Sequence, residues 1–267
     1  MSSSFRFTKI PRIICRPFSG TSHKFYSTKP CPEPRRMNPR KCKKKSPYII
    51  CEPKVEEFPN VLKIMEKNYF REEPTLKFLG LKLNKTLATR IMDRLNEGNS
   101  LVAKCKYTGR MLGVSLNETV KPWDSVLLAR LAEKQECPKT KKLLMFYSFL
   151  EGAPRLFDKN RCLFEIFSTT NVFIDKGERN YGLGLKLTKA SVNLAIDRNY
   201  KLLRCDATNF AFSQLLERLK FKLELHIPYE TYVDKHGERV FQNVQVPNVG
   251  VKIYTLNIEK RKKFSDE

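Results

Sequence analysis

The segment from residue 179 to residue 184 carries the residue types in this chain that are best suited to binding a ligand. It reads Arg-Asn-Tyr-Gly-Leu-Gly and lies between an apolar run and an amphipathic pattern. Gly182 and Gly184 have no Cβ atoms that would block a ligand. The first N–H groups of a helix lack intrahelical acceptors, and the helix dipole is positive at that end. Such a turn can bind a pyrophosphate, although a tight strand-to-helix turn without any ligand has the same composition.

Strands and helices alternate around this turn. Residues 162–174 are rich in Phe, Ile and Val and predict a strand, and the apolar spacing over residues 183–197 predicts an amphipathic helix. A turn containing Gly109 predicts a hairpin. The other predicted elements are a strand at 48–51, a helix at 58–70, the hairpin at 99–116, a helix at 139–149, a strand at 202–205, a helix at 212–219 and strands at 221–227 and 249–256. The fold class is therefore α/β (α+β), with helices around a mixed sheet.

The order of strand, RxxGxG turn, helix and strand, followed by Asn209 and Phe221, resembles the core of the GNAT superfamily of N-acetyltransferases. Three further segments resemble insect arylalkylamine N-acetyltransferase-like proteins. They are the F-x-D/E-E-P element at 70–74, the G-V-x-L-N strand at 113–117 and the Y..Y.D..G..VF pattern at 229–241. The resemblance covers roughly residues 48–257. It implies a GNAT-type, mostly antiparallel sheet flanked by helices.

The resemblance also implies an acetyl-CoA-dependent N-acetyltransferase that acts on a small primary amine of the arylalkylamine type. An alkylammonium group has a pKa near 10, so its attack on a thioester needs a base. The family position for this base is Glu73, and Thr208 keeps one hydroxyl of the proposed proton relay. Direct attack in a ternary complex requires no acyl-enzyme. The residues implied in acetyl-CoA binding are Val172, Phe173, Ile174, Arg179, Asn180, Tyr181, Gly182, Leu183, Gly184 and Asn209.

Several positions depart from the family pattern. Phe212 replaces a relay hydroxyl, and Leu216 stands where many members have a tyrosine acid. Lys220 replaces a glycine, so a left-handed backbone there would be strained. These departures leave open a second interpretation, in which a weak or inactive GNAT-fold protein keeps CoA binding. Glu73 itself also has a simpler interpretation, as a surface carboxylate at a helix end.

The resemblance implies that two segments, residues 78–101 and residues 119–142, form the acceptor pocket. A cationic amine would need acidic residues in this pocket. Trp123 is a possible lining residue, although ordinary packing is the simpler expectation. Cys162 and Cys205 are expected to be buried thiols rather than nucleophiles.

The charge of the chain is strongly basic and unevenly distributed. Of 267 residues, 51 are Lys or Arg and 28 are Asp or Glu, which gives a formal net charge of +23. Residues 1–54 contribute about half of this excess. The organisation predicted is a basic leader or linker at 1–46, an acyltransferase domain at 47–260 and a charged tail at 261–267. The leader is Ser-rich and nearly free of acids, as in a mitochondrial presequence. A cytoplasmic protein with a basic arm is the alternative, because Pro11 and Pro17 would interrupt a helix.

The remaining partner classes are constrained by composition. No run of about 18 apolar residues exists, so we expect no membrane span. Because the chain has only three histidines and no CxxC pair, we expect no metal site. A nucleic-acid-associated basic protein is the weaker alternative, because the charge outside the leader can serve anionic CoA. We expect a monomer.

Overall fold

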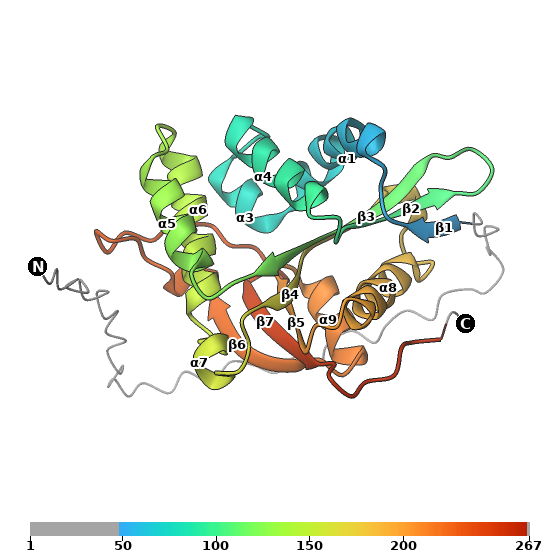
Figure 1. Ribbon diagram of the computed structural model, residues 1–267. Coiled ribbons are helices and arrows are strands. Elements are labelled where there is room, and N and C mark those ends of the chain that lie inside the picture. Colours follow the sequence, from blue (N-terminus) through green and yellow to red (C-terminus); the bar gives the residue numbers. More distant parts are fainter. Residues whose placement is uncertain (1–47, 266–267) are drawn as a thin grey trace, which may run out of the picture. The chain divides into compact units, whose positions relative to one another are not determined.

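The computed structural model describes residues 48–265, and these residues are built around a seven-stranded sheet (Figure 1). The predicted leader or linker at 1–46 and the last two residues lie outside the described residues. No helix within residues 48–265 is both long and apolar enough to cross a membrane. The strands are β1 (Tyr48–Cys51), β2 (Leu101–Cys105), β3 (Met111–Val120), β4 (Ile166–Ile174), β5 (Leu202–Ala207), β6 (Lys222–Pro228) and β7 (Gly250–Asn257).

The helices occupy the connections between the strands. They are α1 (Phe58–Ile64), α2 (Phe70–Glu72), α3 (Pro74–Leu79), α4 (Lys85–Asn96), α5 (Asp124–Glu133), α6 (Pro138–Gly152), α7 (Leu156–Lys159), α8 (Leu183–Asp197) and α9 (Phe210–Arg218). A π-helical turn, η2 (Met65–Tyr69), joins α1 to α2, and short 3-10 turns are η1 (Val55–Glu57), η3 (Lys176–Glu178) and η4 (Tyr229–Thr231). The π turn is the kind of irregularity that often occurs near functional sites.

The sheet has the strand order β1-β2-β3-β4-β5-β7-β6. Neighbouring strands are antiparallel everywhere except between β4 and β5, which are parallel. A parallel pair needs a crossover connection, and α8 supplies it. The predicted mixed, mostly antiparallel sheet flanked by helices is therefore confirmed.

Helices cover both faces of the sheet. Figure 1 shows α1, α3 and α4 on one side and α8 and α9 on the other. The alternation of side chains along β2 has the same two-sided pattern. Val102 packs into the core beneath α1, α3 and α4, whereas Leu101 and Ala103 pack against α8.

The sequence predicted most of the sheet but fewer of the helices. β1 and α8 have the predicted bounds, whereas β4 begins at Ile166 instead of residue 162. The skipped residues 162–165 are apolar except for Glu165, but they lie outside the core, and Phe164 is 79% exposed. The expectation of a buried thiol at Cys162 is wrong because Cys162 is exposed, whereas Cys205 is buried. Helices α3, α4, α5 and α7 were not predicted.

The pattern at residues 229–241 forms part of the core. Tyr229, Tyr232 and Phe241 are buried around Phe146 of α6, and the Phe146 ring centroid lies 4.7 Å from both the Tyr232 and Phe241 centroids. Gly237 adopts a φ of +80° in the turn of this segment. The motif therefore joins the last loop to α6 by edge-to-face aromatic packing.

Gly113 of β3 lies where the sheet, β4 and α8 meet. A Cβ atom at this position would lie 2.7 Å from Ile174 Cδ1, 2.9 Å from the Phe173 carbonyl oxygen and 3.1 Å from Leu187 Cδ1. These separations are shorter than normal van der Waals contact, and the Phe173 oxygen belongs to the backbone. Only glycine fits without displacing β4.

We expect Gly113→Ala to destabilise the protein by about 1–3 kcal/mol, because added core volume forces strands apart. Urea unfolding followed by circular dichroism measures the change. Gly177→Ala is the matched control, since its Cβ would meet nothing within 4 Å. Equal stability of the two variants would contradict the proposed packing.

Candidate active site

The site begins where β4 and β5 separate. These strands pair only through Phe167–Thr169 of β4 and Leu203–Cys205 of β5. On its other side β4 contains a β-bulge, because Leu116 pairs with Asn171 and Asn117 pairs with Thr169. The extra residue is Thr170, whose Oγ1 donates a hydrogen bond to the Leu116 carbonyl oxygen over 3.1 Å. A bulge bends a strand and changes its direction, so the end of β4 leaves β5.

The predicted cofactor strand, Val172, Phe173 and Ile174, is this diverging end of β4. Within residues 48–265 its side facing β5 has no paired strand. An open strand edge can bind an extended ligand through main-chain hydrogen bonds. The three residues thus lie where an extended pantetheine arm could add to the sheet.

The predicted glycine turn follows directly and opens α8. Gly182 is the N-cap residue with a φ of +80°, and no side chain caps the helix. A Cβ atom at Gly182 would meet nothing within 4 Å, so the turn faces open space. A Cβ atom at Gly184 would instead lie 3.7 Å from both Ile174 and Leu215. Gly182 therefore supplies backbone conformation and an open approach, while Gly184 lies against β4 and α9.

Arg179 connects this turn to α2. Its Nη2 lies 2.6 Å from Glu72 Oε2, and its Nε donates to the Ile174 carbonyl oxygen over 2.9 Å. Lys176 Nζ lies 3.0 Å from the other oxygen of Glu72. Partial burial favours protonation of Glu72, but the hydrogen bonds from Lys176 and Arg179 outweigh it and lower the pKa of Glu72. Lys176 and Arg179 are thus both held by the carboxylate of Glu72.

The structure also places the remaining residues that were predicted to bind acetyl-CoA. Asn180 is exposed with a φ of +67°, Tyr181 is half-buried and Leu183 is buried at the start of α8. Asn209 caps α9 by accepting a hydrogen bond from the Phe212 N–H at 2.9 Å. Asn248 accepts from the Phe210 N–H at 3.0 Å. The side-chain oxygen of Asn209 therefore caps the N-terminus of α9.

Glu73 is a buried carboxylate, not a surface one. It lies between α2 and α3 in an extended conformation that precedes Pro74, and its relative exposure is 5%. Burial raises the pKa of Glu73 to about 7, while hydrogen bonds from the hydroxyls of Thr208, Thr75 and Tyr69 oppose this rise. The Thr75 bond to Oε1 measures 3.3 Å. The predicted pair Glu73 and Thr208 thus lies in one hydrogen-bonded cluster.

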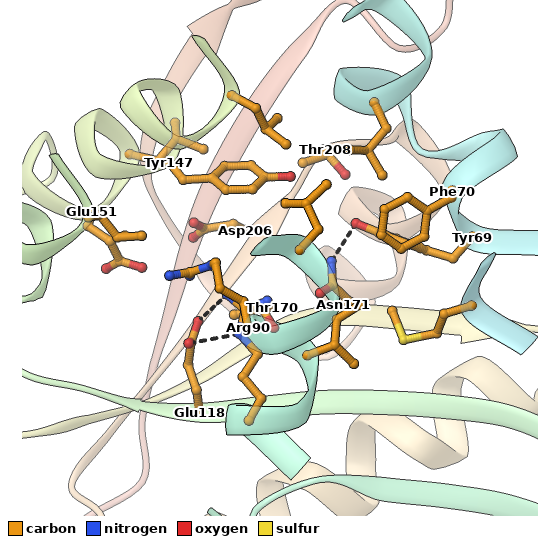
Figure 2. Close-up of a pocket in the computed structure, with 18 residues that line it drawn as sticks. Tyr69, Phe70, Arg90, Glu118, Tyr147, Glu151, Thr170, Asn171, Asp206 and Thr208 are labelled. Atoms are coloured by element: carbon orange, nitrogen blue, oxygen red, sulfur yellow. Dashed lines mark hydrogen bonds and ion pairs between the residues drawn. The ribbon is translucent and has the colours of Figure 1, made fainter. Parts of the chain in front are cut away.

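A pocket adjoins this cluster (Figure 2). Tyr69, Tyr147 and Thr208 line it next to Glu73, and Tyr147 Oη lies 3.5 Å from Thr75 Oγ1. The Tyr69 hydroxyl accepts a 2.5 Å hydrogen bond from Asn171 Nδ2 at the divergence of β4. The pocket therefore extends from the hydroxyls of Tyr69 and Thr208, which bond to Glu73, to Thr170 and Asn171 at the divergence of β4, although Glu73 itself is not a lining residue. Its apolar walls are Met65, Phe70, Leu76, Leu87, Ile91, Leu128, Leu143 and Leu150.

The pocket also holds several charges. Arg94 of α4 pairs with both oxygens of Glu118, at 2.8 and 2.9 Å. The buried Arg204 contacts Glu151 at 2.6 Å and Asp206 at 2.7 Å. Burial outweighs the nearby Arg204 and raises the pKa of Glu151.

Sequence reasoning located only part of this pocket. Helix α4 lies in the predicted segment 78–101, but the segment 119–142 contributes only Leu128, and α6 contributes more. Trp123 lies outside the pocket and is 55% exposed. The charged lining residues Arg90, Arg94, Glu118, Glu151 and Asp206 were missed. The available signal was the placement of Arg90 and Arg94 four residues apart on the strongly amphipathic α4.

Comparison with solved structures identifies the fold of this chain. No protein-family model matches the chain, and no curated protein matches it in sequence. Solved structures do match. A mosquito arylalkylamine N-acetyltransferase-like protein 5b has a TM-score of 0.74 and 19% identity, covering 79% of this chain and 100% of that one. The chain has the GNAT fold.

Two further GNAT-fold structures are similar. Arylalkylamine N-acetyltransferase 2 of Aedes aegypti has a TM-score of 0.72 at 23% identity, over 79% of this chain and 99% of that one. A polyamine N-acetyltransferase of Drosophila melanogaster, which forms N-acetylagmatine, has a TM-score of 0.72 at 19% identity, over 79% of this chain and 100% of that one. The resemblance inferred from the short sequence motifs is thus confirmed for the fold.

The raised pKa of Glu73 predicts a pH-dependent stability cost. Because its pKa rises from 4.5 to about 7 on folding, the folded state binds more protons between these values and loses stability as pH rises. Glu73→Gln has no such titration. Its stability relative to the wild type should therefore increase by about 3 kcal/mol between pH 4.5 and 7.5.

Urea unfolding of both proteins across this pH range measures the effect. Glu66→Gln, at an exposed position, is the control and should show no such pH-dependent difference. A constant difference between Glu73→Gln and the wild type would mean that Glu73 is not buried as an acid of raised pKa.

Proposed function

We propose that this protein is an acetyl-CoA-dependent N-acetyltransferase that acetylates a small primary amine of the arylalkylamine type. The observation that carries the proposal is the buried Glu73, with its pKa of about 7, beside a pocket that opens at the divergence of β4. A base with this pKa is half ionised at neutral pH and can accept a proton from an ammonium group. The GNAT fold supports the same reaction class.

The proposed donor site consists of the open end of β4 and the glycine turn. Gly182 faces open space, and the uncapped start of α8 presents N–H groups with a positive helix end. Both features fit the pyrophosphate of CoA. Acetyl-CoA would supply the activated acyl group. Lys176 and Arg179, now paired with Glu72, are the cations beside the turn that an anionic donor would attract.

In the proposed reaction Glu73 is the general base and the amine attacks directly in a ternary complex. The amine nitrogen forms a bond to the acyl carbon, the carbon–sulfur bond breaks, and the proton lost from nitrogen passes to Glu73 directly or through water. Thr208 and Thr75 hold Glu73 through their hydroxyls. No cysteine is required, in agreement with the high pKa that burial gives Cys205.

A second candidate function is CoA binding with little or no turnover. Leu216, at the family position of a tyrosine acid, is fully buried within the core. No proton donor can act from that position. Lys220 stands at the family position of a glycine, and it adopts the left-handed conformation that a glycine favours, with a φ of +64°. Tyr147 and Tyr69 are the hydroxyls near Glu73 that remain available.

We expect acetyl-CoA to bind with micromolar affinity and the binding to require an uncharged Gly182 position. Gly182→Glu places a negative charge beside the pyrophosphate, and Gly182→Gln is its matched control with the same size and the same backbone strain. Isothermal titration should show binding at least about tenfold weaker for Glu than for Gln, since like charges repel. Equal affinities for the two variants would remove the donor site from the turn.

Catalysis by Glu73 predicts a large kinetic effect. Loss of a general base typically lowers the rate about 10²- to 10⁴-fold, so Glu73→Gln should lower kcat/KM by this amount while acetyl-CoA binding persists. The wild-type kcat/KM profile should contain a rising limb near pH 7 that the variant lacks. A thiol-release assay with phenethylamine measures both, with Glu66→Gln as control.

Three results have distinct meanings. Binding without turnover for any amine would favour the second candidate function. Turnover that Glu73→Gln does not change would exclude Glu73 as the base. Steep salt-dependent retention of residues 48–265 on DNA would instead revive a nucleic-acid role.

A further inference from the structure

The acceptor pocket contains one arginine without a partner. Arg90 lies on α4, one turn before Arg94, and lines the pocket together with Glu118, Tyr147 and Glu151 (Figure 2). Among residues 48–265, no carboxylate lies within ion-pair distance of Arg90, and no group accepts a hydrogen bond from it. Arg94 and Arg204 differ in this respect, since each pairs with carboxylates at 2.6–2.9 Å. None of the five N–H donors of Arg90 bonds to another described residue.

The surroundings of Arg90 disfavour its charged form. Removal from water, together with repulsion by Arg94, lowers the pKa of the Arg90 guanidinium, while Glu118 only partly opposes this effect. Arg90 is only partly buried, and its nitrogen atoms are not among the fully buried polar atoms that lack a partner, so its guanidinium remains accessible from the pocket. A charged group that lines a pocket without a protein partner is available to a ligand.

The shape of the guanidinium group indicates the ligand chemistry. Its parallel N–H donors match the two oxygens of a carboxylate, and such charge-assisted bidentate pairs are among the strongest hydrogen-bonded contacts in proteins. Apolar side chains such as Leu87, Ile91 and Leu143 form the wall of the same pocket. They suit a methylene or aromatic body. Tyr147 borders the Glu73 cluster through Thr75 and also lines the pocket with Arg90.

We propose that the acceptor is an amino carboxylate, whose amine meets Glu73 and whose carboxylate pairs with Arg90 across the apolar pocket. This inference rests on the proposed function and specifies its substrate class. Arg90 is a substrate-binding residue in this arrangement. The acidic residues of the pocket do not compete for it, because Glu118 is held by Arg94, and Glu151 and Asp206 are held by Arg204.

The test compares amines that differ only in the carboxylate. Initial rates with acetyl-CoA are measured for 4-(2-aminoethyl)benzoate against phenethylamine, and for ω-amino acids of three to six carbons against n-alkylamines of equal length. The wild type should prefer the carboxylate in at least one pair by about tenfold in kcat/KM. In Arg90→Gln this ratio should fall about 30-fold, as expected for loss of a buried charge pair, mainly through KM.

Two further variants separate charge from structure. Arg90→Lys keeps a positive charge and should retain part of the preference. Arg130→Gln, at an exposed position on α5, should leave the ratio unchanged. Because Arg90 has no partner to lose, Arg90→Gln should keep or raise the melting temperature. A large fall in melting temperature would identify Arg90 as a structural residue and overturn the inference.

The outcomes distinguish this inference from the proposed function. A wild type that prefers the uncharged amine in every pair, or an unchanged ratio in Arg90→Gln, overturns the amino carboxylate while acetyl transfer stands. If no amine is acetylated, the proposed function fails. Titration of 4-(2-aminoethyl)benzoate into the CoA-loaded protein then decides the site. Binding that Arg90→Gln abolishes would support it, and absence of binding to the wild type would overturn it.

Discussion

The pairing of β4 with β5 ends after three residues, and the rest of the site depends on that separation. Thr170 is the extra residue in β4, and its hydroxyl bonds to the Leu116 carbonyl oxygen on β3. A flat continuation of the sheet would pair the end of β4 and leave no edge for a ligand. With the bulge, the chain turns away and carries the glycine turn and the start of α8 with it. The open strand edge, the glycine turn and the mouth of the pocket therefore have a common cause.

Burial then determines the chemical character of the carboxylate. Pro74 requires an extended residue before it, which separates α2 from α3 at Glu73 and places its side chain in the interior. Three hydroxyl donors stabilise the ionised form, yet desolvation prevails, so the pKa rises to about 7. Its neighbour Glu72 has the opposite shift, because Lys176 and Arg179 pair with it. Two adjacent glutamates thus differ in protonation because they face different surroundings.

The electrostatics of the pocket are local. A net charge of +23 would suggest a poor site for a cationic amine, but the pocket holds Glu118, Glu151 and Asp206 close to three arginines. Arg94 and Arg204 pair with carboxylates, and Arg90 does not. The arrangement of partners, and not the sum of charges, decides which groups remain available to a substrate. This is also why the total charge says little about the acceptor.

The sequence alone predicted the sheet class, the bounds of β1 and α8, and the grouping of the glycine turn with the strand before it. These features are local, since periodicity, glycine content and the Glu-Pro step are written in consecutive residues. The short helices α3, α4, α5 and α7 were missed. Helix α4 had a readable signal in Asn84, which caps it, and in its buried Leu87, Ile91 and Leu95. The family resemblance also singled out Glu73 and Thr208, which the fold brings into one hydrogen-bonded cluster although 135 positions separate them in the chain.

Only the tertiary structure decided the burial, the partners and the protonation of those residues. Burial of Glu73, the capping role of Asn209 and the lack of a partner for Arg90 depend on atoms contributed by distant elements, and no local pattern contains that information. The pattern at 229–241 illustrates the same limit, because it is a family signature in the sequence and an aromatic core around Phe146 in the fold. Local sequence determines conformation through short-range sterics and hydrogen bonds. Protonation state and ligand chemistry depend on desolvation and pairing, which arise only when the chain has folded.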